Sequence, residues 1–98
     1  MKFAIYFRPE AEQDIENAAQ WYEQQKSGLG YDFLAEIENI TKIISQNVLG
    51  YEKIYRDLHR TVIRRFPFNL FYLVEENAII IIAVIHGSRH PKNWKNRT

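Results

Sequence analysis

The sequence predicts an α+β fold: an N-terminal strand, an antiparallel helical hairpin and a three-stranded antiparallel meander, forming one small sheet with both helices on one face. Two observations carry this prediction. Apolar residues recur twice at helical spacing in the first half of the chain, and three short apolar runs separated by turn residues fill the region 59–86. The 98 residues, 46% of them hydrophobic, suit a single domain over residues 1–98 with one core.

The chain begins with a short apolar run at residues 3–7, which predicts a strand. A helix over 9–26 should follow, because Pro9 suits a first helical position and the acidic residues behind it favour the positive end of the helix dipole. One apolar stripe runs along this helix at helical intervals: Ala11, Ile15, Ala18 and Tyr22.

A second helix is predicted over 29–46, where the same intervals separate Phe33, Ile37, Ile40 and Ile44. The link between the two helices is very short and contains Gly28, so the helices should pack antiparallel as a hairpin. Residues 47–55 are expected to form a loop.

The three later apolar runs predict strands over 59–65, 68–75 and 78–86, with a short polar turn between the last two. A side-chain period of two places Phe68, Leu70, Tyr72 and Val74 on one face of the middle strand, and Phe71 and Leu73 on the other. The same period divides the last strand into Ile80, Ile82 and Val84 on one face and Ile79, Ile81, Ala83 and Ile85 on the other. Strands that are apolar on both faces are normally covered on both faces.

The two predicted helices have one apolar stripe each, so the hairpin can cover only one face of the sheet. Soluble monomers rarely leave a large apolar patch exposed. We therefore expect a partner chain, or a second copy of this chain in a homodimer, to cover the other face.

Charge is spread unevenly along the chain. Residues 1–49 hold four Lys/Arg and eight Asp/Glu, a net charge of −4, whereas residues 50–98 hold nine and four, a net charge of +5. This asymmetry indicates either ordinary solvated charge or a basic surface that meets an anionic partner.

The absence of cysteine excludes disulfides, a thiol nucleophile and Cys-ligated zinc, and it fits a cytoplasmic location. The first apolar run is too short for a signal peptide, and no run is long enough to span a membrane. No serine hydrolase elbow, phosphate-binding loop or zinc motif is present. His86 and His90 lie four residues apart across a glycine, with no carboxylate at useful spacing, so we expect no metal site and no cofactor.

Basic and imidazole side chains gather late in the chain: His59, Arg60, Arg64, Arg65, His86, Arg89, His90, Lys92, Lys95 and Arg97. Such arginines either hold phosphate oxygens in a bidentate manner or form salt bridges with the acidic helices. His86, at the end of a strand, suits a general base near neutral pH or a packed, hydrogen-bonded histidine. Trp21 and Trp94 are expected to be packing anchors rather than platforms for base stacking.

Taken together, short motifs spread over almost the entire chain resemble the RelE/ParE superfamily of toxins from type II toxin–antitoxin modules. The motifs are A-E-x-D-I, W-Y-E, L-G-x-x-F-L-x-x-I, R-F-P-F-x-L-F-Y and A-V-I-H-G-S-R-H-P-x-x-W. The matching residues are Ala11, Asp14, Ile15, Trp21, Tyr22, Glu23, Leu29, Gly30, Phe33, Leu34, Ile37, Arg65, Phe66, Pro67, Phe68, Tyr72, Val84, His86, Gly87, Arg89, Pro91 and Trp94. The resemblance implies the fold predicted above and a cognate antitoxin that wraps the toxin.

One branch of that superfamily, the RelE-like toxins, consists of ribosome-dependent ribonucleases that act on mRNA with positively charged side chains. For this branch the resemblance implies catalytic roles for Arg60 and Arg89, with His86, or alternatively His90 or Lys95, as the substitute for a missing group. Val62 and Asn69 stand where such ribonucleases carry a positive charge, and Lys95 stands where they carry an aromatic hydroxyl. These departures argue against the ribonuclease branch.

The His86-Gly87-x-Arg89 ending is closer to the ParE branch, whose members inhibit DNA gyrase and catalyse nothing. For this branch the resemblance implies a docking surface for gyrase or its DNA complex. That surface would consist of Arg64, Arg65, Arg89, His90, Lys92, Trp94 and Lys95. A third alternative is a degenerate member that only binds its antitoxin.

Overall fold

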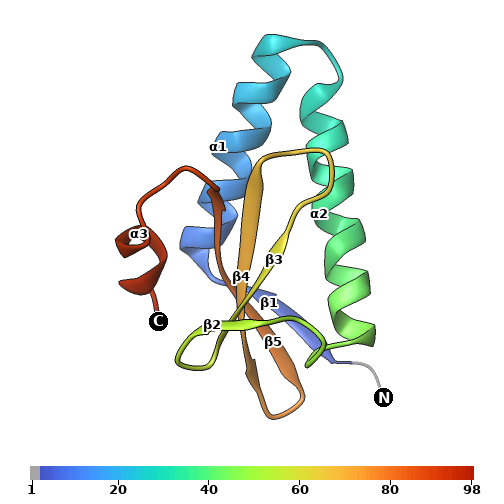
Figure 1. Cartoon of the computed structure of the whole chain (residues 1–98). Coiled ribbons are helices and arrows are strands. Elements are labelled where there is room, and N and C mark those ends of the chain that lie inside the picture. The colour runs from blue at the N-terminus through green and yellow to red at the C-terminus, as the bar shows by residue number, and fades with distance from the viewer. Residues whose placement is uncertain (1–2) are drawn as a thin grey trace.

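Two layers make up the molecule, a helical hairpin and a five-stranded sheet, and they confirm the predicted α+β class (Figure 1). The structure is a computed structural model that describes residues 3–98. The helices are α1 (Pro9–Gln25), α2 (Leu29–Gln46) and a short α3 (Lys92–Lys95). The strands are β1 (Ala4–Phe7), β2 (Lys53–Tyr55), β3 (Leu58–Val62), β4 (Phe68–Glu75) and β5 (Ala78–His86).

The sheet has the strand order β1-β5-β4-β3-β2. β1 pairs in parallel with the first half of β5, from Ala4 opposite Ala78 to Phe7 opposite Ile81, and all other pairs are antiparallel. β1 then gives way to α1, because Pro9 cannot donate to a sheet and starts the helix instead. The second half of β5 therefore has no strand beside it on that edge.

The turn between α1 and α2 is fastened by one carboxylate. Glu23 accepts hydrogen bonds from the backbone amides of Gly28, at 2.9 Å, and Gly30, at 3.0 Å, and so satisfies donors at the start of α2. Gly28 has a left-handed φ of 91°, which glycine adopts without strain. A Cβ on Gly30 would lie 2.6 Å from the Ala19 carbonyl oxygen, so the two helices approach closely at that point.

The larger core lies between the hairpin and the sheet. The stripes predicted for the two helices meet the β4 face predicted from its side-chain period. The fully or nearly fully buried members include Ala11, Phe33, Ile37, Ile44, Ile63, Leu70, Tyr72, Ile79, Ile81 and Val84.

The prediction for the two faces of β5 is wrong, because the strand contains a bulge. Phe71 lies opposite Ala83, but the next residue, Tyr72, lies opposite Ile81, so Ile82 is an extra residue. The bulge shifts the side-chain period by one residue. As a result Ile79, Ile81 and Val84 face the helices, whereas Ile80, Ile82, Ala83 and Ile85 face away.

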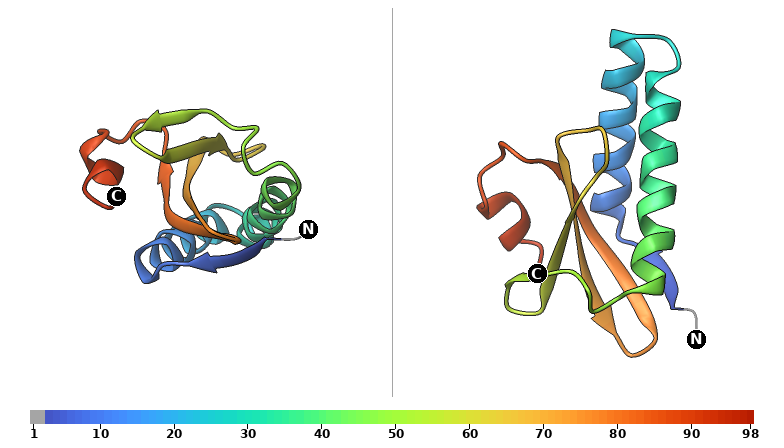
Figure 2. Two further views of the ribbon diagram at one scale, coloured as in Figure 1. Left: turned by 90° about the horizontal axis from the view of Figure 1, so that it is seen from below. Right: turned by 45° about the vertical axis from the view of Figure 1, so that its right-hand side comes forward.

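The expectation that this second face needs a partner chain is also wrong. Leu58, Phe71 and Ile82 have exposed fractions of 1% or less. The covering side chains are Ile54 of β2 and Trp94 of α3. Figure 2 shows α3 and the helical hairpin on different sides of the strands. The chain's own last residues seal the surface that the sequence pattern left open.

Two boundaries differ from the prediction. β3 ends at Val62 rather than at residue 65, because residues 63–67 turn back toward β4, with Arg65 at a left-handed φ of 73°. The expected loop over 47–55 contains β2, a three-residue edge strand paired with β3. Within residues 3–98, no helix is both long and apolar enough to cross a membrane.

Candidate functional site

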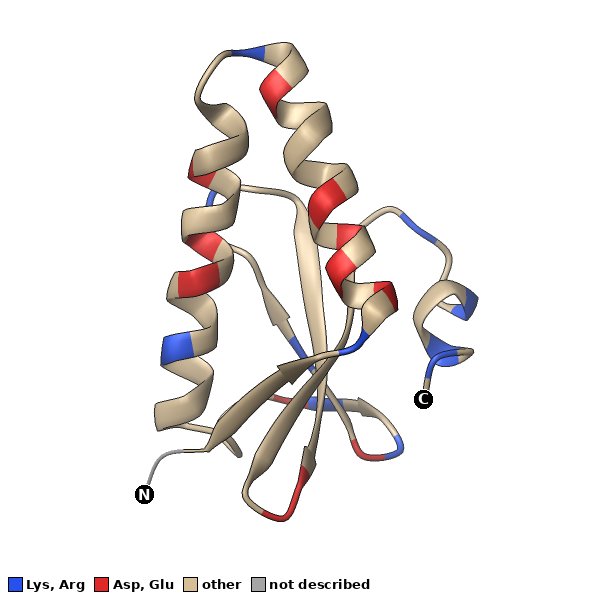
Figure 3. Ribbon diagram, turned by 180° about the vertical axis from the view of Figure 1, so that it is seen from behind, with Lys and Arg blue, Asp and Glu red and all other residues tan. Residues whose placement is uncertain are grey.

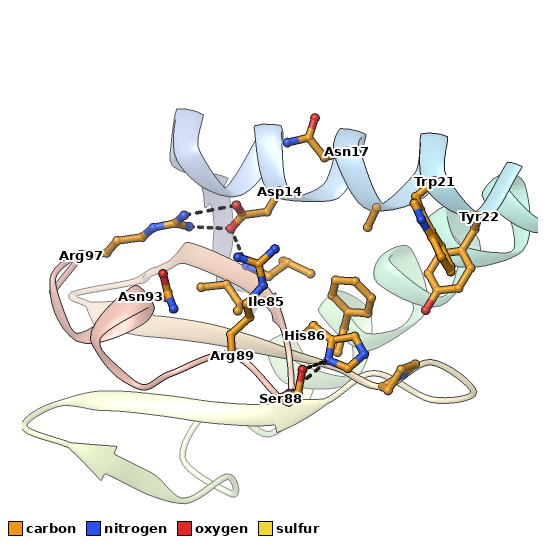
Figure 4. Close-up of a pocket in the computed structure, with 14 residues that line it drawn as sticks. Asp14, Asn17, Trp21, Tyr22, Ile85, His86, Ser88, Arg89, Asn93 and Arg97 are labelled. Carbon is orange, nitrogen blue, oxygen red and sulfur yellow. Dashed lines mark hydrogen bonds and ion pairs between the residues drawn. The ribbon is translucent and has the colours of Figure 1, made fainter. Parts of the chain in front are cut away.

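A cleft of about 670 Å³ lies beside the second half of β5, where β1 no longer pairs with it (Figure 4). Residues of α1 form one wall, and residues 86–97 form the other. Pro67, Phe68, Val84 and Ile85 also line it. The cleft unites the late basic segment with α1, which the sequence analysis treated only as a packing helix.

An ion pair between α1 and the C-terminal segment closes one end of the cleft. The Arg97 guanidinium binds both carboxylate oxygens of Asp14, with the second nitrogen 3.2 Å from Oδ1. Asp14 also accepts the Val84 amide at 3.0 Å, and Arg97 donates to the Ile82 carbonyl at 3.3 Å. The pair therefore satisfies backbone groups at the β5 bulge, which the neighbouring strand would otherwise bind.

The sequence analysis missed this pair. It assigned Asp14 to the helix dipole and counted Arg97 only among the basic residues. The two residues are 83 positions apart, and the bulge that they bridge leaves no signal in the side-chain pattern. Opposite charge was the only available indication.

His86, the last residue of β5, and Arg89, in the segment that follows, line the cleft. The His86 Nδ1 accepts the Ser88 amide at 3.1 Å, so a neutral His86 carries its proton on Nε2. Figure 4 shows the Arg89 side chain pointing into the cleft toward α1. Arg89 is exposed, and it forms no ion pair with any residue of the described part of the chain.

The aromatic residues of the cleft form a continuous row. The ring centroids of Trp21 and Tyr22 are 5.1 Å apart, those of Tyr22 and Phe68 are 6.1 Å apart, and those of Phe68 and His86 are 5.3 Å apart. Trp21 remains 57% exposed, whereas burial raises the pKa of Tyr22 above its usual value. The row gives the cleft an apolar wall opposite Arg89.

The remaining predicted site residues lie in two other places. At the β3–β4 turn, Arg64 is exposed, and Arg65 is 3.7 Å from an Asp32 oxygen and 3.8 Å from a Glu36 oxygen of α2. Arg60 of β3 pairs with Glu52. Two of the late arginines, Arg65 and Arg97, thus bind helix carboxylates, as one of the sequence alternatives stated.

The other group lies on and before α3. Trp94 stacks on Phe71, with ring centroids 5.0 Å apart, so it is the packing anchor that the sequence analysis expected. Lys95 lies 5.1 Å from the centroid of the Tyr55 ring, and His90 and Lys92 are exposed. Figure 3 shows Asp and Glu concentrated on α1 and α2, and Lys and Arg on α3.

The arrangement offers charge and aromatic surface rather than a catalytic dyad. No group of three or more potential metal ligands occurs within the residues that the structure describes.

His59 is buried, hydrogen-bonds the Tyr51 carbonyl at 2.9 Å and stacks on Tyr72, so it belongs to the core.

Comparison with known proteins identifies a family. A model described as "ParE toxin of type II toxin-antitoxin system, parDE" matches residues 5–91. No curated protein sequence matches this chain.

Three solved structures share the fold. The chromosomal ParDE toxin–antitoxin system of P. aeruginosa is 13% identical, with a TM-score of 0.65 over 87% of this chain and 96% of that one. The toxin–antitoxin complex RelBE2 of Mycobacterium tuberculosis is 17% identical, with a TM-score of 0.62 over 88% and 99%. The YoeB dimer of Staphylococcus aureus is 23% identical, with a TM-score of 0.62 over 88% and 98%. These likenesses concern the fold.

Proposed function

Because the chain belongs to the ParE toxin family of type II toxin–antitoxin systems, we propose that it stops bacterial growth by binding DNA gyrase, without catalysis. The observation that carries this proposal is the match of the ParE model over residues 5–91, which includes α1, α2 and all five strands except the first residue of β1, but not α3. The chain would then act as the toxin of its module.

The exposed basic residues support a docking role. Arg64 and Arg89 form no ion pair within residues 3–98, and His90 and Lys92 are exposed close to Arg89 in the chain. Unpaired surface cations steer association with an anionic partner and are available to pair with its carboxylates or phosphates. Arg89 is the central candidate among them, and Arg65 contributes less because it already binds α2.

The ribonuclease alternative has weaker support. Val62 is 64% exposed on β3 and lies opposite Asn69 of β4, so a neutral pair occupies two positions where RelE-like ribonucleases carry positive charge. Arg60 is held by Glu52. Without those charges, a negatively charged transition state would gain less stabilisation at this sheet.

A cognate antitoxin is the partner that this function requires. The similar structures from P. aeruginosa and M. tuberculosis are titled as toxin–antitoxin assemblies, which supports such a partner here. The S. aureus relative is titled as a dimer, which supports homodimerisation as a second mode of assembly. Family membership is what supports an antitoxin partner, because Trp94 of α3 covers the second face of the sheet.

The decisive experiment is to induce the chain in a bacterium and assay purified gyrase alongside. Filamentous cells, a DNA-damage response and loss of supercoiling by gyrase in vitro are expected. Prompt arrest of protein synthesis with cut messages would replace gyrase by the ribosome as the target. Normal growth would leave a protein that only binds its antitoxin.

Arg89→Ala tests the docking surface. We expect it to abolish growth arrest, whereas Lys26→Ala, which removes a charge at the far tip of the hairpin, should leave toxicity intact. Full toxicity of the Arg89 variant would exclude this arginine from the target interface.

A further inference from the structure

The cleft beside β5 contains a feature that gyrase docking does not use. Trp21 projects from α1 at the cleft wall and is 57% exposed, whereas Trp94 is stacked against Phe71. An indole normally gains stability by burial, so one left open beside a cavity is a candidate surface for a ligand.

Trp21 offers an open ring face to a flat ligand, and the rings beside it pack on one another edge to face, at interplanar angles of 83°, 63° and 73°. Trp21, Tyr22, Phe68 and His86 follow one another with centroid separations between 5.1 and 6.1 Å. Figure 4 shows Trp21 on the α1 wall and His86 on the facing wall at the same end of the cleft, with Arg89 farther along it. Aromatic side chains bind nucleic acid bases of any sequence through their faces, at about 1–3 kcal/mol per base.

The charge of the cleft suits an anion. Asp14 is the only carboxylate among the described residues that line it, and Arg97 neutralises it through two hydrogen bonds. Arg89 is left without a partner among residues 3–98. The neighbouring acidic residues of α1, Glu12 and Glu16, line a different groove on the other side of the helix, together with Leu34.

Polar groups that read base edges are also present. Asn17, at the rim of the cleft, accepts a hydrogen bond from Gln13 through its oxygen, and its amide nitrogen is not used in that bond. Amide side chains are common partners of base edges. The volume of about 670 Å³ falls within the range of small-ligand sites.

We propose that this cleft binds one nucleotide of single-stranded nucleic acid, with the base against Trp21 and the phosphate on Arg89. A nucleotide combines a flat ring, hydrogen-bonding edges and negative charge in one unit, and the cleft offers a counterpart to each. An acidic peptide would satisfy Arg89 but has no general use for the indole face and the Asn17 amide. The proposal does not depend on gyrase as the target.

The test uses Trp21 as its own reporter. The chain has two tryptophans, so Trp94→Phe, which keeps a ring against Phe71, leaves Trp21 as the single indole. Titration with octamers of deoxythymidine and of uridine, and with thymidine 5′-monophosphate, should give saturable quenching of the Trp21 fluorescence. The DNA and RNA arms identify which nucleic acid binds more tightly, and the monophosphate shows whether one nucleotide suffices.

Matched variants separate this site from general charge attraction. Arg89→Gln should weaken octamer binding about tenfold, the loss of one charge-assisted contact. Arg56→Gln removes an exposed arginine from the β2–β3 turn, which does not line the cleft, and should change binding less than twofold. Trp21→Ala, followed by anisotropy of a labelled octamer in the otherwise unchanged chain, should also weaken binding about tenfold.

Three results would overturn the proposal. The first is the absence of saturable quenching by all three ligands. The second is an equal loss of affinity in the Arg89 and Arg56 variants, which would indicate non-specific charge attraction. The third is equal quenching by a decameric peptide of glutamate, which would make the cleft a site for acidic protein segments. None of these results bears on inhibition of supercoiling, which tests the gyrase proposal separately.

Discussion

The two faces of the sheet are covered in different ways. On one face, α1 and α2 bring whole stripes of apolar residues onto β4 and β5, and fourteen buried residues form one cluster. On the other face, five buried residues are covered by β2 and by the four-residue α3, with Trp94 as its main contact. The first face is a core made by long elements, whereas the second depends on a few side chains near the C-terminus.

Because of this difference, the residues that contribute most to the stable core and the residues proposed to bind a partner lie in different parts of the molecule. The docking residues Arg89, Lys92 and Lys95, and one wall of the cleft, belong to the segment that covers the second face. Segments with few buried contacts open at lower free energy than the core does. The exposed cations thus lie on the part of the molecule that can adjust to a partner at the least cost to the fold.

The largest effect should come from the helix-side core. Phe33 is fully buried, and its ring centroid lies 5.1 Å from that of Phe66 and 5.3 Å from that of Phe68. Phe33→Ala should lower the free energy of unfolding by about 3–5 kcal/mol, because it leaves a cavity in the core that the surrounding side chains fill only in part. Urea denaturation followed by circular dichroism measures this loss, and a change below 1 kcal/mol would contradict the assigned core.

A smaller effect is expected on the second face. Trp94 is only partly buried, so Trp94→Ala should cost about 2 kcal/mol, less than Phe33→Ala despite the larger side chain removed. Loss of the indole should also expose Phe71 and Ile82, so the variant should bind a hydrophobic dye that the unchanged protein does not. Trp94→Phe is the matched control, because it retains a ring on Phe71. Equal losses for Trp94→Ala and Phe33→Ala would remove the distinction between the two faces.

The Asp14–Arg97 ion pair tests how the two faces are connected, because it joins α1, on the first face, to the C-terminal segment that covers the second face. The side chains are 17% and 24% exposed, so Asp14→Asn should cost about 1–2 kcal/mol, more than a typical surface ion pair. The amide retains an acceptor for the Val84 amide but loses the charge that Arg97 binds. A double-mutant cycle with Arg97→Gln should show a coupling energy near 1 kcal/mol. Coupling near zero would mean that the pair does not fasten the C-terminal segment.

The sequence could predict the parts of the fold that local patterns govern. Both helices, their stripes and the division of β4 into two faces follow from side-chain periodicity over a few residues. The β5 bulge did not follow, because every residue from Ile79 to Ile85 is apolar and one extra residue leaves no mark in such a run. The face assignment failed from Ala83 onward for that reason.

The candidate site was harder to predict than the fold. Arg89 and His86 were identified from their place after the last strand, and both line the cleft. The opposite wall was missed, since Trp21 belongs to a helix that the pattern assigned entirely to packing. Only the three-dimensional arrangement shows that one tryptophan is an anchor and the other is open. A short C-terminal helix without an apolar stripe likewise gave no sign that it would cover a sheet.

The smallest effect at neutral pH concerns a polar contact inside the helix-side core. Tyr72 is fully buried and donates to the Val48 carbonyl at 2.7 Å, so Tyr72→Phe should cost about 1 kcal/mol. Burial, with a smaller contribution from Tyr51, raises the pKa of Tyr72 from 10.0 to about 12.

This shift gives the contact a pH signature. The unfolded chain ionises near pH 10 and the folded chain near pH 12, so the stability from the neutral phenol is complete below pH 10 and is lost as pH rises toward 12. Unfolding free energies measured between pH 9 and 12 should therefore fall less steeply in Tyr72→Phe than in the unchanged protein. Parallel slopes would show that Tyr72 ionises as freely in the folded chain as in the unfolded chain. The helix-side core would then admit water at its centre, as we expect of the second face once Trp94 is removed.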